Sequence, residues 1–196
     1  MSAAARGPLA QFAGAYAESR LALFGLALLA AIALVALLAP WLAPQNPYDL
    51  MALDILDSRL PPGSPSGDGR MIHRLGTDEQ GRDMLSAIFY GLRISIMVGL
   101  SATVIALAIG MALGLVAGYF GGRFDTVLMR IADIQLSFPS ILTAMILLAL
   151  FGQGIDKIII ALVASQWAYY ARTTRGAALV ERRKEYIEAA RLLGLS

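Results

Sequence analysis

Long runs of apolar residues alternate with short polar segments along this chain, and the length of each run predicts an element. A helix needs about 20 apolar residues to cross the roughly 30 Å hydrocarbon core of a bilayer. Three stretches are long enough: residues 21–42, 94–120 and 121–155, the last with an amphipathic start. A fourth run, residues 156–171, is shorter and ends in Trp and Tyr residues that suit a membrane interface. We therefore predict four membrane-spanning helices.

Composition narrows the class of protein. Hydrophobic residues make up 58% of the chain and charged residues 15%, whereas soluble domains carry about 45–50% and 25%. The chain has no cysteine, which excludes disulfides and thiolate metal sites, and its one histidine, His73, excludes a histidine cluster. A net charge of +2 does not indicate a nucleic-acid partner. We predict an all-α polytopic membrane protein that is surrounded by lipid and holds no metal.

The first apolar run has two interpretations. Residues 1–20 form a polar, alanine-rich lead, and residues 21–42 follow as the first span. A cleaved signal peptide is the alternative, but the apolar core of such a peptide has only about 7–15 residues. Trp41 near the end of the run suits the far interface of a bilayer. We favour an uncleaved span.

Residues 43–93 are predicted to leave the membrane. Prolines and glycines crowd the middle of this stretch, which is typical of a loop. Thr77 and Gln80 then match a capping box, in which each side chain bonds a free backbone N–H at the start of a helix. We therefore expect a helix over about 78–91 that rests on the membrane surface.

Acidic residues close to His73 raise the question of a metal site in this loop. His73, Asp78 and Asp83 would supply three ligands. The alternative is a set of ion pairs in which Arg74 or Arg82 neutralises one of the two carboxylates. We favour the ion pairs, because the arginines are near and only one imidazole is present.

Small residues recur at every fourth position in the segment 94–120, which places them on one face of a helix. They are Ala102, Ala106, Gly110, Gly114 and Gly118. In lipid, such a face lets a second helix approach backbone to backbone. Chance is the alternative, because glycine is frequent in membrane helices. Five small residues in register favour a helix-packing face.

The stretch 121–155 begins with an amphipathic half and continues as an uncharged, apolar run. Arg130 and Asp133 are three positions apart, so we expect them to pair on the surface of one helix. Pro139 lies inside the apolar half, where it is expected to kink or restart the helix.

The last segment, residues 172–196, is basic at its start and then predicts a short helix with two faces. Tyr186, Ala189 and Leu193 fall on an apolar stripe, and Gly194 is expected to stop the helix. A plain surface helix is the alternative, because glutamate and alanine are good helix formers. A two-faced helix tethered at the membrane suits contact with a soluble partner.

Basic residues predict the orientation. With four spans, both termini and the turn at 121–123 share one side of the membrane, and this side carries most of the basic residues. They are Arg6, Arg20, Arg123, Arg130, Arg172, Arg175, Arg182, Arg183, Lys184 and Arg191. The positive-inside rule places that side in the cytoplasm and residues 43–93 outside it.

Three blocks of residues, in order along the chain, resemble the permeases of ABC importers for dipeptides, oligopeptides and nickel. The first block lies in the outer loop and contains Gly76, Thr77, Asp78, Gly81, Arg82 and Asp83. The second runs from Asp125 to Asp133 and is followed by Phe138 and Pro139. The third contains Glu188, Ala189, Ala190 and Gly194. The resemblance extends from about Ser19 to Ser196.

In that family the third block forms a coupling helix that docks into a groove on a separate ATPase. The resemblance therefore implies an ATPase-coupling role for a set of residues in the last segment. They are Glu185, Tyr186, Glu188, Ala189, Ala190 and Gly194. It also implies a multi-pass transmembrane subunit in the bacterial inner membrane. The expected partners are a second permease subunit, two cytoplasmic ATPase subunits and a periplasmic or lipid-anchored substrate-binding protein.

Dipeptides or oligopeptides are the cargo that the resemblance implies, and nickel or another small solute stays open. The chain contains no Gly-x-x-x-x-Gly-Lys-Ser/Thr motif and no catalytic motif. We therefore expect no cofactor on this chain and no enzymatic activity of its own, with ATP and Mg bound by the partner ATPase subunits.

Family members continue through two further spans, so the resemblance implies that four helices of an expected six are present. The sequence is then expected to be a fragment or a truncated product. Two other classes stay open: a secondary transporter or channel without an ATPase, and a membrane protein that does not transport. The two-faced helix on the cytoplasmic side favours the importer.

Overall fold

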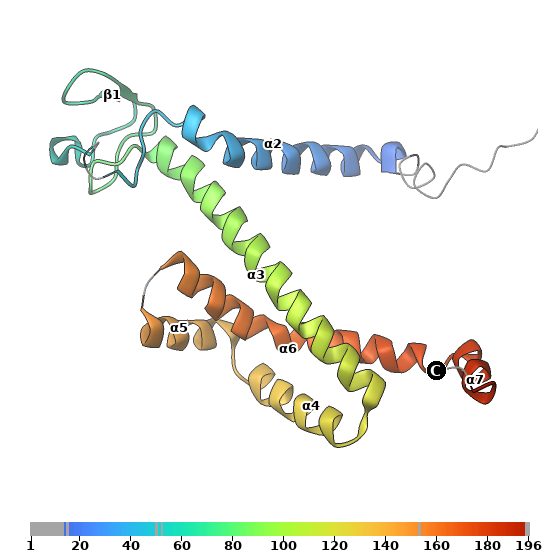
Figure 1. Ribbon diagram of the computed structural model, residues 1–196. Coiled ribbons are helices and arrows are strands. Elements are labelled where there is room, and N and C mark those ends of the chain that lie inside the picture. Colours follow the sequence, from blue (N-terminus) through green and yellow to red (C-terminus); the bar gives the residue numbers. More distant parts are fainter. Residues whose placement is uncertain (1–13, 15, 50, 52, 153, 195–196) are drawn as a thin grey trace, which may run out of the picture. The chain divides into compact units, whose positions relative to one another are not determined.

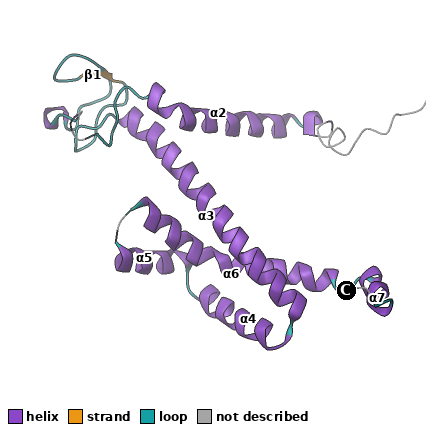
Figure 2. Cartoon of the chain, viewed as in Figure 1, coloured by secondary structure: helices purple, strands orange, loops and turns teal. Residues whose placement is uncertain are grey.

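The computed structural model describes residues 14, 16–49, 51, 53–152 and 154–194 (Figure 1). Nearly all regular structure among them is helical, as Figure 2 shows, and the predicted all-α class is confirmed. The helices are α2 (Arg20–Leu42), α3 (Met84–Phe120), α4 (Gly122–Ser137), α5 (Ser140–Phe151), α6 (Ile155–Glu181) and α7 (Glu185–Leu192). The chain divides into two compact units, Met1–Ile96 and Met97–Ser196, which are described separately.

The first unit contains α2 and the loop that follows it. The Ser19 hydroxyl accepts a hydrogen bond from the backbone N–H of Ala22 at 3.3 Å and so caps the start of α2. The loop contains one turn of 3-10 helix, η2 (Ile55–Asp57), and a short antiparallel pair, β1 (Ser64–Pro65) with β2 (Ile72–His73). Apart from these pieces, hydrogen bonds from side chains and between backbone groups distant in the sequence hold the loop together.

The prediction of a helix from Asp78 was wrong. Residues 78–83 form a turn, and α3 begins at Met84. The Asp78 carboxylate accepts hydrogen bonds from the backbone N–H groups of Gln80 and Arg82, at 2.8 and 3.0 Å. Aspartate that bonds its own backbone in this way favours a turn over a helix. Gly81, with φ of +77°, bends the chain away from helical geometry.

The predicted break between a surface helix and a second span was also wrong. Helix α3 runs for 37 residues without interruption, a length of about 55 Å. Gly91 and Arg93 both lie inside it. A glycine within a helix costs only about 1 kcal/mol, which a long apolar helix tolerates. The helix therefore starts in the outer loop and continues through the whole stretch 94–120.

In the second unit, Pro139 restarts the helix as the sequence predicted. Helices α4 and α5 meet there at an angle of 91°. Phe138 has extended backbone dihedrals, φ −94° and ψ 140°, because the proline ring excludes helical geometry at the residue before it. The predicted third span is thus a bent pair of helices, and both of its parts contact α6.

The helix that contains the predicted fourth span does not end at residue 171. Helix α6 continues to Glu181, through several positively charged residues. Among the described residues, two helices are long and apolar enough to cross a membrane, α2 and α3, and the bent pair of α4 and α5 would make a third. The charge in its second half explains why α6 is not among them. Arginines in that second half bind carboxylates of α4, and these contacts stabilise the helix beyond residue 171.

Candidate functional site

The glycines in the row of small residues on α3 lie against α6. All five are buried: Ala102, Ala106, Gly110, Gly114 and Gly118. A Cβ atom on Gly110 would lie 2.6 Å from the carbonyl oxygen of Trp167, and one on Gly114 would overlap the carbonyl oxygen of Ala171. Neither position leaves space for a side chain. The two helices therefore touch through their backbones, the kind of approach that small residues permit in lipid.

Two arginines of α6 pair with two aspartates of α4. Arg175 binds the Asp125 carboxylate through two nitrogens, with Nη2 2.6 Å from Oδ2. Arg172 pairs with Asp133 across the same two helices, through a single nitrogen, Nη2. The predicted pair of Asp133 with Arg130 was wrong, because α4 packs on α6 and turns the Asp133 carboxylate toward the longer-range partner. Arg130 is exposed.

A third arginine holds the end of α6 to the end of α3. Arg182 donates a hydrogen bond from Nη1 to the carbonyl oxygen of Gly118 at 2.7 Å. That carbonyl lies in the last turn of α3, where helix carbonyls have no partner within the helix. The basic segment predicted to fix orientation therefore also has a structural role, because three of its arginines make contacts between helices.

Helix α7 follows α6 after a turn at residues 182–184. Lys184 Nζ lies 2.7 Å from the Glu181 carboxylate, and the Tyr186 hydroxyl donates to the same carboxylate. These hydrogen bonds, first from Lys184 and then from Tyr186, lower the pKa of Glu181 below its usual value, and the carboxylate in turn raises the pKa of Tyr186. The turn between α6 and α7 is thus held by side chains on both of its ends.

The predicted coupling residues lie on α7 or just beyond it. Glu185, Tyr186 and Ala189 are exposed. The side chains of Glu188 and Ala190 lie outside the described part of the chain. Helix α7 ends at Leu192, and Gly194 has a φ of +72°, a backbone conformation that favours glycine after a helix end. Leu192 and Leu193 are 89% and 77% exposed, so the end of α7 presents an apolar surface.

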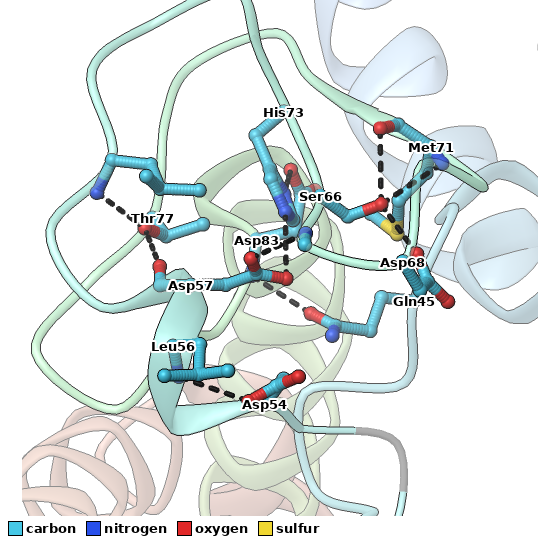
Figure 3. Close-up of polar contacts among 12 residues, drawn as sticks. Gln45, Asp54, Leu56, Asp57, Ser66, Asp68, Met71, His73, Thr77 and Asp83 are labelled. Atoms are coloured by element: carbon cyan, nitrogen blue, oxygen red, sulfur yellow. Dashed lines mark hydrogen bonds and ion pairs between the residues drawn. The ribbon is translucent and has the colours of Figure 1, made fainter.

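The outer loop surrounds a buried cluster of polar side chains, drawn in Figure 3. The His73 ring is fully buried, with Nδ1 3.1 Å from Oδ1 of Asp83 and Nε2 3.7 Å from Oδ2 of Asp57. The other oxygen of Asp83 accepts hydrogen bonds from the backbone N–H and hydroxyl of Ser86, at 2.8 and 2.7 Å. Gln45 Oε1 accepts from the backbone N–H of Asp83 at 2.8 Å. The cluster joins the end of α2, the loop and the start of α3.

Backbone contacts at two glycines close the loop around this cluster. Gly76 and Gly81 both have a φ of +77°. A Cβ atom on Gly76 would overlap the carbonyl oxygen of Leu60, and one on Gly81 would overlap that of Asp54. Thr77 accepts a hydrogen bond from the backbone N–H of Leu60 at 2.8 Å. The glycines of the first motif block therefore serve close packing of the loop backbone.

The remaining charged residues of the first block form one of the ion pairs that the sequence predicted. Arg82 Nε lies 2.7 Å from Oδ2 of Asp78, which confirms that pair. The structure does not bring His73, Asp78 and Asp83 together, because Asp78 faces Arg82. Within the described residues, no group of three or more His, Cys, Asp or Glu side chains is arranged to hold a metal ion.

Sequence reasoning missed three members of the buried cluster. Asp57, Gln45 and Ser86 come from separate parts of the chain, and Gln45 and Ser86 are joined by a hydrogen bond of 3.2 Å. No periodicity links them, because they meet only when the loop folds back on the start of α3. Asp57 stands next to a hydrophobic residue in a region of irregular structure, and its burial carries no signal in the sequence.

The acid dependence of this loop can be predicted from Asp78. Burial alone would raise the pKa of Asp78, but hydrogen bonds from the N–H groups of Arg82 and Gln80 and from the Arg82 guanidinium lower it below the usual 3.8. A carboxylate with a lowered pKa stabilises the fold above that usual value and loses this contribution as the pH falls through the lowered one. At pH 7 we expect Asp78→Asn to weaken hydrogen-exchange protection of the amides of Gln80 and Arg82. The difference between variant and wild type should vanish once the pH has fallen below the lowered pKa of Asp78. A difference that persists there would contradict this role.

Two family descriptions match the chain. Residues 110–196 match the binding-protein-dependent transport system inner membrane component. Residues 8–62 match the N-terminal transmembrane domain of oligopeptide transport permease C. The first match includes Gly110, Gly114 and Gly118 of α3, the arginine contacts and α7, and the second includes α2.

Several transport permeases are similar along most of the chain. The di/tripeptide transport system permease of Pseudomonas aeruginosa is 39% identical over 95% of this chain and 60% of its own length. The dipeptide transport system permease of Escherichia coli K12 is 41% identical over 95% of this chain and 61% of its own. The oligopeptide transport system permease of Bacillus subtilis is 36% identical over 91% and 55%.

The chain spans about 60% of the length of the first two of these relatives. The matches include the regions in which the three motif blocks lie, and they confirm the resemblance drawn from the sequence. The chain belongs to the family of inner-membrane permease components of binding-protein-dependent transport systems, together with dipeptide and oligopeptide permeases.

Proposed function

We propose that this chain acts as a transmembrane permease subunit of an ATP-driven importer of dipeptides or oligopeptides. The family supports a transport role, and the relatives are named as permeases for dipeptides, di/tripeptides and oligopeptides. Peptides carry charged ends and variable side chains, so a permease that moves them needs a cavity that opens to one side of the membrane at a time rather than a fixed filter. This chain's role would be to change the side to which the cavity opens.

The observation that carries the proposal is the position of α7. This helix is exposed, has a polar and an apolar side, and follows α6 after a turn of three residues. Helix α6 is in turn held to α3 and α4 by three arginines. A protein that binds α7 and changes shape would therefore displace a helix that is packed within the permease.

The proposed assembly follows from this arrangement. It contains a second permease subunit, two cytoplasmic ATPase subunits that contact α7, and a substrate-binding protein on the outer side. ATP and Mg are bound by the ATPase subunits, and this chain contributes no cofactor site. The excess of basic residues on the α7 side supports cytoplasmic termini and an outer position for the loop with His73.

Ala189 offers the test of this function. A tryptophan there would block close approach to the small face of α7, so we expect Ala189→Trp to lower ATP-dependent uptake of a labelled dipeptide at least tenfold. Gly194→Asp is expected to act in the same direction, because an aspartate strains the positive φ at that position. The measurement is uptake by cells that produce the full-length importer, normalised to permease in the membrane.

Ala177 provides the matched control. It is an exposed alanine on α6, and Ala177→Trp adds the same bulk away from α7. Normal uptake with Ala189→Trp would contradict the coupling role. Uptake that persists in ATP-depleted cells and follows an ion gradient would indicate a secondary transporter instead, and no accumulation of any peptide would indicate a membrane protein without a transport role.

A further inference from the structure

The contact between Asp125 and Arg175 differs from the other ion pairs of the second unit. It uses two parallel hydrogen bonds, which fix the direction of the side chains as well as their distance. The Asp125 side chain is 14% exposed and that of Arg175 is 31% exposed. The Arg172–Asp133 pair is about half exposed on both sides. Water screens an exposed pair strongly and a shielded one much less.

We propose that the Asp125–Arg175 ion pair is a positioning contact that makes α4 move together with α6 when α7 is displaced. The inference rests on the proposed function, and it names the route by which a push on α7 reaches the bent pair of α4 and α5. Asp125 and Arg175 touch neither substrate nor ATP in this account. They act by joining two helices.

Several hydrogen bonds hold the turn between α6 and α7, so a displacement of α7 is not taken up by a change in the turn. The N–H of Arg182 donates to the carbonyl of Ala178 at 3.0 Å, and that of Lys184 donates to the carbonyl of Glu181 at 3.1 Å. The Tyr186 hydroxyl spans the turn to Glu181 as well. A displacement of α7 is therefore carried into α6, whose Arg172 and Arg175 pair with α4 and whose capping residue Arg182 bonds α3.

Helix α4 is the element that needs such a contact. At its start, Gly121 and Gly122 have φ of +66° and +64°, and at its end Pro139 breaks the chain at 91°. Glycines with positive φ and a proline break are places where a helix can change direction as a unit. The position of α4 is therefore decided by its side contacts with α6. Leu128 and Ala132 are the buried apolar residues of α4.

Apolar contacts hold the two helices together but resist sliding weakly, whereas a bidentate ion pair fixes register. This difference sets the test. Asp125→Asn removes the charge, and the double variant Asp125→Leu with Arg175→Met removes the pair without leaving a shielded charge unpaired. Replacing both partners of such a pair by apolar residues is often neutral or stabilising, so the double variant is expected to fold. Asp133→Asn is the matched control in the exposed pair.

The experiment measures labelled dipeptide imported per ATP hydrolysed by the full-length importer, purified with its partners and reconstituted in liposomes. Both Asp125 variants are expected to lower this ratio about tenfold, with Asp133→Asn within twofold of wild type. A fall in the amount of assembled importer at an unchanged ratio would show that the pair only stabilises packing, and would overturn the proposal. An unchanged ratio in the double variant would overturn it too.

The outcomes also separate this inference from the proposed function. If the ratio is normal in the Asp125 variants while Ala189→Trp abolishes uptake, the coupling role of α7 stands and the Asp125–Arg175 route is wrong. If the unsubstituted importer moves no peptide on ATP, the proposed function fails and the route fails with it.

Discussion

Replacing Gly114 with leucine is expected to remove most of the folded protein from the membrane. A single Cβ at this position already overlaps the carbonyl oxygen of Ala171 and comes within 3.0 Å of Cβ of Thr174. Backbone atoms cannot move aside as a flexible side chain can. Forcing extra atoms into a packed site costs about 1–3 kcal/mol, and more where nothing can relax. Leucine adds three further carbon atoms, so α3 and α6 would have to separate.

Alanine at the same position gives the sharper comparison. Gly114→Ala should destabilise the protein by about 1–3 kcal/mol, although alanine in an exposed helix is favoured over glycine by roughly 0.5–1 kcal/mol. Gly99 is the matched control, because it lies on α3 with nothing within 4 Å of the added atom. Gly99→Ala is expected to be neutral or stabilising. The measurement is the thermal midpoint of the purified protein in detergent, followed by size-exclusion chromatography. Equal midpoints for the two alanine variants would contradict the close contact.

Loss of the His73 imidazole is expected to open the outer loop. The ring lies between the carboxylates of Asp57 and Asp83 and is fully buried. Without it, the buried Asp83 carboxylate loses the hydrogen bond to the ring. Leaving a buried acceptor without its hydrogen-bond partner costs about 1–3 kcal/mol, and more where the acceptor is charged. A free energy above about 1.4 kcal/mol raises the population of an opened loop by roughly tenfold or more.

Limited trypsin digestion in detergent measures this opening, because the loop contains several arginines. His73→Ala should be cut in the loop at least tenfold faster than wild type. His73→Asn, which keeps a hydrogen-bond donor for Asp83, should fall between the two. The neighbouring exposed Arg74 supplies the control, and Arg74→Met is expected to leave the rate at other sites unchanged. Equal cleavage of wild type and His73→Ala would show that the cluster does not hold the loop closed.

Much of the candidate site follows from local patterns. The spacing of four between small residues is a property of one helix, so it predicted which face of α3 is small, and the structure places that face against α6. Pro139 predicted the break between α4 and α5, because the proline ring restricts the backbone of the preceding residue in any tertiary context. The third motif block predicted a short helix from its amphipathic pattern. In each case the signal and its cause lie within one turn of the chain.

The predictions that were wrong depended on contacts between residues far apart in the sequence. Thr77 and Gln80 matched a helix start, yet the Asp78 carboxylate bonds nearby backbone N–H groups and forms a turn. Its bonds to Arg82 and the close contact of Gly81 with the backbone of Asp54, in a distant part of the loop, stabilise that turn. Asp133 had an arginine three positions away, yet it pairs with Arg172. At Asp133 the local partner lost to a distant one, because the packing of whole elements decides which side chains meet.

The sequence by itself determined the class of the protein, its family and the position of most helices, because apolar length, helical period and motif blocks act over short stretches. Only the tertiary structure decided how the charges are used. Asp83 and His73, or Asp125 and Arg175, become partners because the fold shields them from bulk water at the same place. A charge shielded from water needs a partner, and which one it finds depends on the whole fold rather than on its neighbours in sequence.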